Sequence, residues 1–361
     1  MMVKDWFLGQ AINALLTYRS RPGAIRSALA RRQYARAAVP TRDRVTVAVV
    51  QMQIDLVEDG VQFAEKYYDL VRQAVERDAA LIVFPEYAWL PILGLLPVVR
   101  DLAQKGVTLE GAAKGLGGGL TIASVFRTIA PAVRRIFETT GSQLAARFGV
   151  WLMPGSAVIA DRAGRLFNMA YLFGPDGALV GTQRKLHRTN MEDWMTTGSE
   201  LGVFELPFAR VAMPVCMDYT YWETTRVATL RGADILLGFS AEAKGNDSFM
   251  AMRGVTARIQ ESFAYGTQAY CVTKLFGLNF CGPSYIVAPL GMRRDYTTCL
   301  ARTKTHGREE IITADLDLAH LSEFRTANPR DFNVALYSKY LPKVYEAYRA
   351  RVTQDGKRKI V

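Results

Sequence analysis

The sequence predicts an α/β fold, and three observations support that class. Short apolar segments rich in Val, Ile and Leu alternate with longer segments of helical periodicity along most of the chain. Half of the 361 residues are hydrophobic, which is enough to form a large core. No linker-like stretch divides the middle of the chain. We therefore expect one main domain at residues 41–340, a helical extension at residues 1–40 and a tail at residues 341–361.

Residues 1–40 are predicted to form a basic helical extension. Met1–Tyr18 has the periodicity of an amphipathic helix, and residues 23–38 that of a second, Arg-rich helix. The apolar face of the first helix is expected to contain Val3, Phe7, Leu8, Ala11, Ile12, Ala14, Leu15 and Tyr18. Seven basic residues stand against one acidic residue here, so much of the net charge of +11 is local. Three interpretations stay open: docking of residues 1–38 on an anionic membrane surface, packing on the body or a neighbouring subunit, and an organelle transit peptide.

Charge and cysteine usage exclude other classes of function. Because the excess basic residues lie at the N-terminus, we expect no nucleic-acid groove through the main domain. Four cysteines without C-x-x-C spacing and three scattered histidines argue against a metal site. Free thiols fit a reducing compartment, and the start of the chain lacks a secretory signal of normal shape. The expected location is cytoplasmic, peripheral at the inner membrane surface if the extension docks there.

The main domain is predicted to consist of short strands whose faces are covered by helices. Strands are expected over residues 45–51, 79–87, 148–159, 166–173, 178–185, 210–216, 235–239, 270–273, 285–288 and 310–314. A helix is expected over residues 60–77, with Val61, Ala64, Tyr68, Leu70, Val71 and Val75 on its buried side. In the tail, Tyr340, Val344 and Tyr348 lie at helical spacing.

The stretch around Cys216 has the pattern of a strand that presents its last residue to a site. An apolar run ends at Cys216, and polar and aromatic residues up to Glu223 follow. A thiol at such a turn is well placed to be a nucleophile, with the N–H of Met217 directed toward a developing oxyanion. The alternative is a small buried Cys that caps a core strand.

Two further ionisable residues also follow apolar strands. Glu86 comes at the end of the strand at residues 79–87, and Lys185 comes at the end of the strand at residues 178–185. Taken singly, Glu86 has the alternative role of a helix cap and Lys185 that of a solvated strand end. A Glu, a Lys and a Cys at three strand ends provide a base, a charge stabiliser and a nucleophile.

Three motifs resemble the Glu–Lys–Cys signature of the nitrilase superfamily, the carbon–nitrogen hydrolases. They are Phe84-Pro-Glu-Tyr87, Arg184-Lys-Leu-His187 and Cys216-Met-Asp-Tyr-Thr-Tyr-Trp-Glu223, and the resemblance extends from about residue 45 to about residue 337. It implies a four-layer α-β-β-α sandwich, with residues 41–340 as the catalytic domain.

The resemblance also implies roles for individual residues. Cys216 is the expected nucleophile, Glu86 the base and acid, and Lys185 the oxyanion stabiliser, whose charge is also expected to favour the thiolate. Glu192 is the best match to a second glutamate of the family, although Asp193 is adjacent. The expected oxyanion and substrate contacts are Met217, Tyr87, Tyr219, Thr220 and Trp194. No metal or organic cofactor is implied.

The substrate class follows from two departures from the family pattern. Many members that act on acid amides have an Arg where this chain has Thr220, and true nitrilases tend to have Trp-Glu directly after the Cys, where this chain has Met217-Asp218. Both departures favour the hydrolysis of a neutral linear amide through a Cys thioester. The alternatives are an N-acyltransferase that passes the acyl group to an amine or lipid acceptor, and a nitrilase.

Residues 90–137 form an unusual insertion. An apolar, Pro-broken run at residues 90–99 is followed by a Gly-rich stretch at residues 115–120, expected to be flexible, and a helix over residues 121–137. We expect an enlarged loop beside the site, whose apolar residues line the entrance, or else an element that packs between subunits. By analogy with the family, the tail is expected to reach across a homodimer or a larger homo-oligomer.

Overall fold

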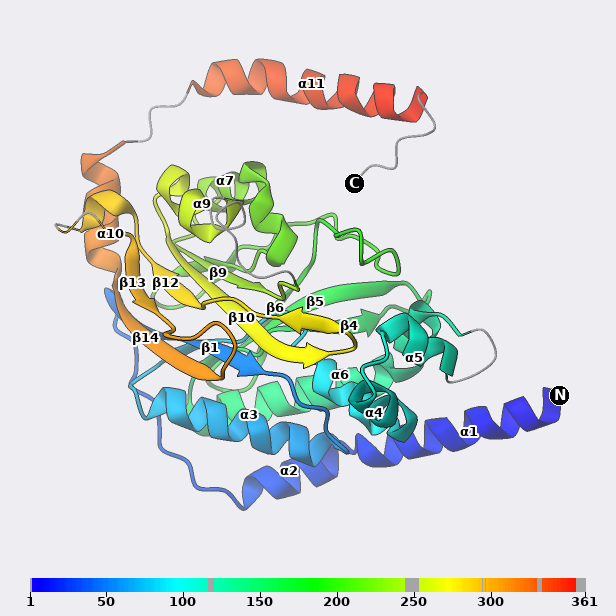
Figure 1. Ribbon diagram of the computed structural model, residues 1–361. Coiled ribbons are helices and arrows are strands. Elements are labelled where there is room, and N and C mark those ends of the chain that lie inside the picture. Colours follow the sequence, from blue (N-terminus) through cyan, green and yellow to red (C-terminus); the bar gives the residue numbers. More distant parts are fainter. Residues whose placement is uncertain are drawn as a thin grey trace.

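The computed structural model describes residues 2–115, 120–243, 253–293, 295, 297–329 and 333–354. Figure 1 shows a strongly curled β-sheet with helices on its outer faces and a long helix at each end of the chain. Within the described residues the sheet has 14 strands, and its two halves enclose a shared apolar core. The protein is therefore a four-layer α-β-β-α sandwich with an N-terminal helical extension, as predicted.

The first half of the sheet has the order β4-β5-β3-β2-β1, with β6 paired to β5 and β14 paired to β1. Its strands are β1 (Arg44–Gln53), β2 (Leu81–Val83), β3 (Trp151–Met153), β4 (Ser156–Ala160), β5 (Leu166–Phe173), β6 (Leu179–Arg184) and β14 (Glu310–Asp317). The pairs β1·β2 and β2·β3 are parallel, whereas β14 runs antiparallel to β1.

The second half has the order β10-β9-β8-β7, with β11 and β12 paired to β10 and β13 paired to β12. Its strands are β7 (Phe204–Glu205), β8 (Arg210–Ala212), β9 (Ile235–Ser240), β10 (Tyr265–Leu275), β11 (Leu278–Phe280), β12 (Tyr285–Val287) and β13 (Cys299–Arg302). Met52 of β1 pairs in parallel with Cys271 of β10 and joins the two halves. The carboxyl ends of parallel strands meet at one edge of a sheet, which is where ligands bind in such folds.

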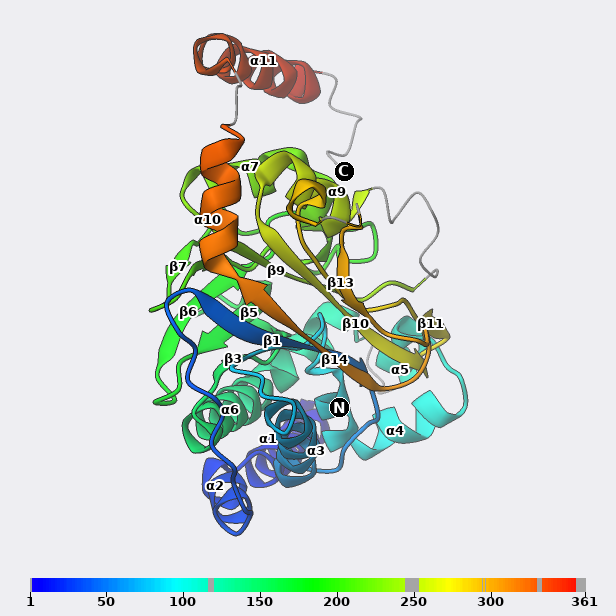
Figure 2. The same ribbon diagram turned by 90° about the vertical axis from the view of Figure 1, so that its left-hand side faces the viewer.

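Two pairs of helices cover the outer faces of the sandwich (Figures 1 and 2). Helices α3 (Gly60–Val75) and α6 (Ile122–Phe148) lie on the first half, and α7 (Trp222–Leu230) and α9 (Val255–Ser262) lie on the second. Asp59 caps α3 by accepting hydrogen bonds from the backbone N–H groups of Val61 and Gln62 at 2.9 and 3.0 Å. A capping box at Thr121 begins α6, and Gly149 ends it with a φ of 72°.

Several boundaries differ from the prediction. Helix α6 continues past residue 137 to Phe148, where Gly149 takes the left-handed conformation that favours a stop. The single strand predicted at residues 148–159 is therefore two strands, β3 and β4, separated by a turn. On α3, five of the six residues predicted on the buried side are buried and Val61 is only half-buried, while Phe63 and Tyr67 widen the buried stripe. The short strands β7, β11 and β13 were not predicted.

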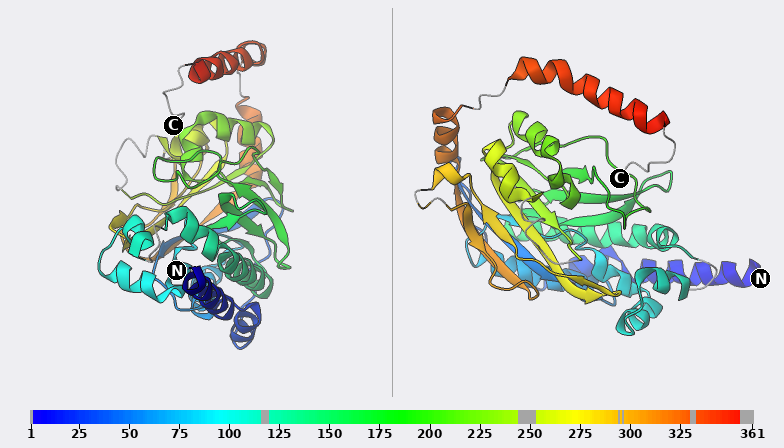
Figure 3. Two further views of the ribbon diagram at one scale, coloured as in Figure 1. Left: turned by 90° about the vertical axis from the view of Figure 1, so that its right-hand side faces the viewer. Right: turned by 45° about the horizontal axis from the view of Figure 1, so that its top comes forward.

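The N-terminal extension consists of α1 (Met2–Arg19) and α2 (Pro22–Ala30). The second helix ends at Ala30 and not at the predicted residue 38, and residues 33–40 have no regular structure. Leu16 of α1 is buried and Ile12 half-buried, whereas Tyr18, predicted on the apolar face, is 62% exposed. The helix thus contacts the body through a narrower stripe than predicted, because only one side of its C-terminal half reaches α6. Its N-terminal part extends beyond the body (Figures 1 and 3).

The insertion at residues 90–137 packs against the core of the same chain. It contains the 3-10 helix η1 (Leu90–Leu95) and the helices α4 (Pro97–Gln104) and α5 (Leu109–Gly115), and it continues into α6. The predicted Gly-rich stretch lies mostly outside the described residues. Leu90–Leu95 of the apolar run are buried in the core of the chain itself, whereas Pro97 and Val98 are exposed.

The C-terminal region adds η3 (Leu290–Met292), α10 (Leu318–Ala327) and α11 (Val334–Gln354). Figure 1 shows α11 extended over α7, separated from the sandwich. The hydroxyl of Tyr345 donates a hydrogen bond to Glu223 of α7. Many large apolar side chains of α11 are exposed: Val334, Leu336, Tyr337, Tyr340, Val344, Tyr345 and Tyr348.

Candidate active site

A cavity of about 400 Å³ lies where the chain leaves β2, β6 and β9. The structure brings all of the predicted site residues to its wall, although they are far apart in the sequence. They are Glu86, Tyr87, Lys185, Glu192, Trp194, Cys216, Met217, Tyr219 and Thr220. Of the two adjacent candidates for the second glutamate position, Glu192 is buried and lines the cavity, whereas Asp193 is exposed.

Cys216 lies at a sharp turn and is not the last residue of a strand, which corrects the prediction. Strand β8 ends at Ala212 because Pro214 has no N–H group with which to continue the ladder, and Val215 makes only a single bridge with Phe239. Cys216 then begins the 3-10 helix η2 (Cys216–Thr220) with a φ of 46°. A residue other than Gly rarely takes this conformation, and such strain is typical of functional sites.

The buried carboxylate of Asp218 holds this turn and was not identified from the sequence. It accepts hydrogen bonds from the backbone N–H of Val215 at 2.9 Å and from those of Leu186 and His187 at 3.1 and 2.8 Å. It also lies 3.0 Å from Nδ1 of His187. One carboxylate therefore fastens the segment after Lys185 to the segment that carries Cys216.

Arg258 of α9 supports the other end of the same turn. Its Nε donates to the carbonyl oxygen of Tyr219 at 2.9 Å, and its Nη2 donates to that of Thr220 at 3.2 Å. The side chain of Thr220 lies within the turn, where Oγ1 donates to Sδ of Met217 at 3.5 Å. Arg258 thus acts on the backbone of the turn from outside the cavity.

The Glu86 carboxylate is almost completely buried and is held by three donors. Asn168 Nδ2 and Lys185 Nζ both donate to Oε1 at 2.8 Å, and the backbone N–H of Ala241 donates to Oε2 at 3.0 Å. Burial raises the pKa of Glu86, the charge of Lys185 opposes the rise, and the negative charge of Glu192 adds to it. A carboxyl group with a raised pKa is suited to both taking up and releasing a proton. Asn168, on β5, was not predicted.

Lys185 lies between two carboxylates. Its Nζ is 2.8 Å from Oε1 of Glu86 and 2.8 and 2.9 Å from the two oxygens of Glu192. Burial opposes the charged ammonium, but Glu86, Cys216 and Glu192 outweigh it and raise the pKa of Lys185. Burial likewise acts against a charged Glu192, but Lys185, the Tyr87 hydroxyl and the Thr189 N–H lower its pKa overall. The pKa values of the two glutamates are therefore shifted in opposite directions, upward for Glu86 and downward for Glu192.

The Cys216 thiol belongs to the same buried group of ionisable side chains as Glu86 and Lys185. Burial and the negative charge of Glu86 raise the pKa of Cys216, and the opposing attraction of Lys185 does not compensate. The charge of Lys185 acts in the expected direction, because it lowers the pKa of Cys216, but burial outweighs it. The thiol is a further hydrogen-bond partner of Glu86.

Aromatic residues form one wall of the cavity. The Phe126 ring lies edge-on between the indoles of Trp89 and Trp194, with ring centroids 5.1 and 4.9 Å away. Of the apolar residues predicted to line the entrance, Trp89 and Leu90 reach the cavity. The others, Ile92, Leu93, Leu95 and Leu96, lie in the core behind it. Phe276, in the turn between β10 and β11, and Leu278 and Phe280 of β11 complete this wall.

Charged residues beyond the predicted set also line the cavity. Glu242 follows β9, and Arg253 precedes α9. Sequence reasoning missed both because neither belongs to a recognised motif. Within the described part of the chain, no three His, Cys, Asp or Glu side chains are grouped so as to hold a metal ion. The same residues include no helix that is long and apolar enough to cross a membrane.

Residues 46–326 match a family model described as carbon-nitrogen hydrolase. The chain belongs to the carbon-nitrogen hydrolase family. It is similar to a nitrilase from Pyrococcus abyssi, with 28% identity over 278 residues that cover 76% of this chain and 90% of the relative. It is also similar to an omega-amidase, NIT2, from Xenopus tropicalis, with 27% identity over 204 residues, 52% of this chain and 69% of the relative.

Solved structures support the fold. A carbon-nitrogen hydrolase from Helicobacter pylori G27 superposes with a TM-score of 0.62 at 20% identity, covering 83% of this chain and 99% of the other. Nit3 of Saccharomyces cerevisiae, a member of the nitrilase superfamily, gives 0.59 at 18% identity with coverage of 83% and 99%. An amidase from Nesterenkonia sp. AN1, with an acetamide moiety added covalently at its active-site cysteine, gives 0.57 at 18% identity with coverage of 81% and 98%. This protein is thus a hydrolase of the nitrilase superfamily.

Proposed function

We propose that this enzyme hydrolyses a neutral linear amide to an acid and ammonia or an amine through a thioester on Cys216. The observation that carries the proposal is the buried group of Glu86, Lys185 and Glu192 beside a thiol at a strained turn, all on the wall of one cavity. Opposed pKa shifts of the two glutamates supply one proton carrier and one fixed charge.

In the first half-reaction, the sulfur of Cys216 attacks the amide carbon while its proton passes to Glu86. The carbonyl electron pair moves to oxygen, and the Lys185 ammonium and the Met217 N–H stabilise the oxyanion. As the oxyanion collapses, the carbon–nitrogen bond breaks and Glu86 returns the proton to the leaving nitrogen. Ammonia or an amine leaves, and the acyl group remains as a thioester.

In the second half-reaction, water gives a proton to Glu86 and attacks the thioester carbon. The same two donors stabilise the second oxyanion. The carbon–sulfur bond then breaks, and the thiolate takes up the proton from Glu86. The acid is released and the resting thiol is restored. Glu192 remains charged throughout and holds Lys185 in place, and the hydroxyl of Tyr87 holds Glu192.

The cavity wall favours an uncharged substrate. Thr220 stands where an Arg would otherwise pair with a substrate carboxylate, and a hydroxyl cannot neutralise that charge. Glu242 and Arg253, the charged residues of the wall outside the predicted set, have opposite signs and do not form a patch of one charge for a charged substrate. The aromatic wall suits an apolar acyl group.

A nitrile is the second candidate substrate, because one relative named a nitrilase matches three quarters of the chain. Both substrates would give an acyl-enzyme at Cys216, so trapping that species tests the proposal directly. We expect intact-protein mass spectrometry to detect a Cys216 adduct after brief incubation with an amide library. An adduct that yields acid in water alone supports a hydrolase, and one that needs an added amine or lipid supports an acyltransferase. The absence of any adduct and any turnover across amides and nitriles would overturn the proposal.

The proposal includes two contacts with larger partners, a second copy of this chain and a membrane surface. The exposed apolar residues of α11 support packing against a second copy of this chain, in a homodimer or larger homo-oligomer. The projecting part of α1 and the exposed arginines of residues 21–36 support docking on an anionic membrane surface.

A further inference from the structure

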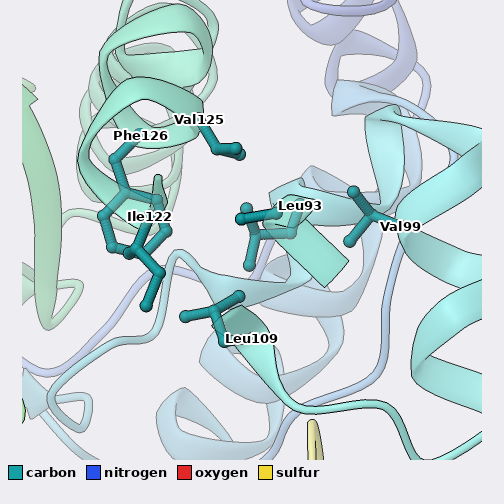
Figure 4. A pocket seen from close by; sticks show the side chains of 7 residues that line it. Leu93, Val99, Leu109, Ile122, Val125 and Phe126 are labelled. Carbon is teal, nitrogen blue, oxygen red and sulfur yellow. The ribbon is translucent and has the colours of Figure 1, made fainter. Parts of the chain in front are cut away.

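A second, much smaller cavity lies inside the insertion, next to the active-site cavity. A void of about 10 Å³ lies between η1, α4, α5 and the first turns of α6, and its lining is entirely apolar. Figure 4 shows the side chains of Leu93, Val99, Ile122 and Val125 around it, together with those of Leu109 and Phe126. These last two residues, which we call the partition, also line the active-site cavity.

The partition is held in place from both sides. The Phe126 ring is buried and is fixed between two indole rings at interplanar angles of 85° and 87°. Leu109, the first residue of α5, is half-buried and packs against the apolar core. A buried ring fixed between two other rings and a side chain packed on the core form a wall that resists displacement by a ligand.

We propose that the partition sets the maximum length of an apolar acyl group. The insertion thereby determines which substrates fit the cavity. This inference rests on the proposed function and extends it to a substrate class, amides of medium-length alkyl or aryl acids. The acyl group is assigned to this wall because it must stay bound while the amine leaves and water enters. A buried apolar wall suits the acyl group, which stays bound. The more exposed mouth of the cavity near Asn190 and Met191 suits the amine that leaves and the water that enters.

The inference predicts a characteristic dependence on chain length. Each methylene that enters the apolar end should raise kcat/KM about fourfold, until the chain reaches the partition. Beyond that length kcat/KM should fall, because the wall cannot retreat. Removal of the partition side chains would join the void to the cavity and move the optimum to longer chains.

The test is a series of straight-chain primary amides, measured by kcat/KM on the full-length enzyme. Leu109→Ala and Phe126→Ala open the partition, and Phe126→Leu is a milder version in case the larger truncation unfolds the protein. Leu93→Ala is the matched control, because it removes the same atoms as Leu109→Ala from the same void without lining the active-site cavity. Thermal melts ensure that all variants are compared in the folded state.

We expect the optimum to shift by at least one methylene in the partition variants and to stay in place in Leu93→Ala. A flat response to acyl length in the wild type would overturn the inference, as would an equal shift in Leu93→Ala. A length dependence found in N-alkyl acetamides and not in the acyl series would also overturn it. Binding of the same amides to Cys216→Ala, measured by calorimetry, separates the two proposals. Binding that depends on acyl length as predicted, without any turnover by the wild type, would support the role of the partition and contradict the proposed hydrolysis.

Discussion

Exchange of each buried glutamate for glutamine gives a sharp test, because the two residues are predicted to respond differently. Glu86→Gln removes the proton carrier and keeps the size of the side chain. Glu192→Gln leaves the proton carrier in place and removes a fixed negative charge. Both side chains contact the same Lys185 ammonium at 2.8 Å, so a difference between the variants reflects chemistry and not position.

The magnitudes follow from the geometry. Loss of a general acid–base group lowers kcat by a factor of about 10² to 10⁴, and we expect that loss in Glu86→Gln. The nearest oxygens of Glu86 and Glu192 are at most about 5.6 Å apart, because both lie 2.8 Å from Nζ. Two unit charges at that distance repel by about 3 kcal/mol at an effective dielectric constant of about 20. This repulsion favours protonated Glu86, in line with the contribution of Glu192 to its raised pKa.

The sign of the pH effect follows directly. Glu86 must be unprotonated to accept the thiol proton, so activity is lost as the pH falls through its pKa. Removal of the Glu192 charge lowers that pKa, so the acid limb of kcat/KM in Glu192→Gln should move to lower pH. The plateau of kcat/KM in Glu192→Gln should also fall, because Lys185 loses the Glu192 carboxylate as a partner. The assay is a pH profile of kcat/KM, with Glu65→Gln, an exposed partner of Arg32, as control. An unchanged or upward-shifted acid limb in Glu192→Gln, or a near-normal plateau in Glu86→Gln, would refute this reasoning.

Four further predictions concern the nucleophile, the substrate, the membrane and the assembly. Cys216→Ala should abolish turnover with an unchanged circular dichroism spectrum, and Lys185→Ala should cost at least about a hundredfold in kcat; near-normal turnover in either would contradict the mechanism. In competition, a neutral amide should show a higher kcat/KM than an equal-sized amide with a terminal carboxylate or the matching nitrile, and the reverse order would disprove the substrate assignment. Full-length protein should co-sediment with anionic liposomes in a salt-sensitive way, and a chain without residues 1–38 should not; if neither sediments, α1 only packs on protein. Deletion of residues 334–361 should reduce the mass found by light scattering to that of the monomer, whereas an unchanged mass would rule out α11 as the subunit contact.

The sequence predicted the parts of the site that local patterns record. Apolar runs that end at Glu86 and Lys185 have strand periodicity and length, and the structure puts both residues just after strands. Cys216 was located correctly on the cavity wall but not on a strand, because Pro214 interrupts the ladder before the apolar run ends. A proline two residues before the predicted strand end was the available signal.

Other residues could not be found from local patterns. Asn168 lies in the interior of β5, and only the pairing of β5 with its neighbours brings it to Glu86. The apolar run of η1 has the same composition whether it covers its own core or a partner subunit, so the sequence could not distinguish these outcomes. Strands of two to four residues such as β7, β11 and β13 are too short to show a period.

The contacts of Asp218 explain how this fold keeps the strained backbone of Cys216 beside the buried group of Glu86, Lys185 and Glu192. Its carboxylate bonds the N–H groups of Leu186 and His187, directly after Lys185, and that of Val215, directly before Cys216. Lys185 and the sulfur are therefore positioned from the same point, while Arg258 secures the carbonyls at the far end of the turn. A shift of either segment would break several of these bonds together, which opposes relaxation of the positive φ at Cys216. Backbone hydrogen bonds to one buried side chain thus fix the distance between Cys216, the proposed nucleophile, and Lys185, the proposed oxyanion stabiliser.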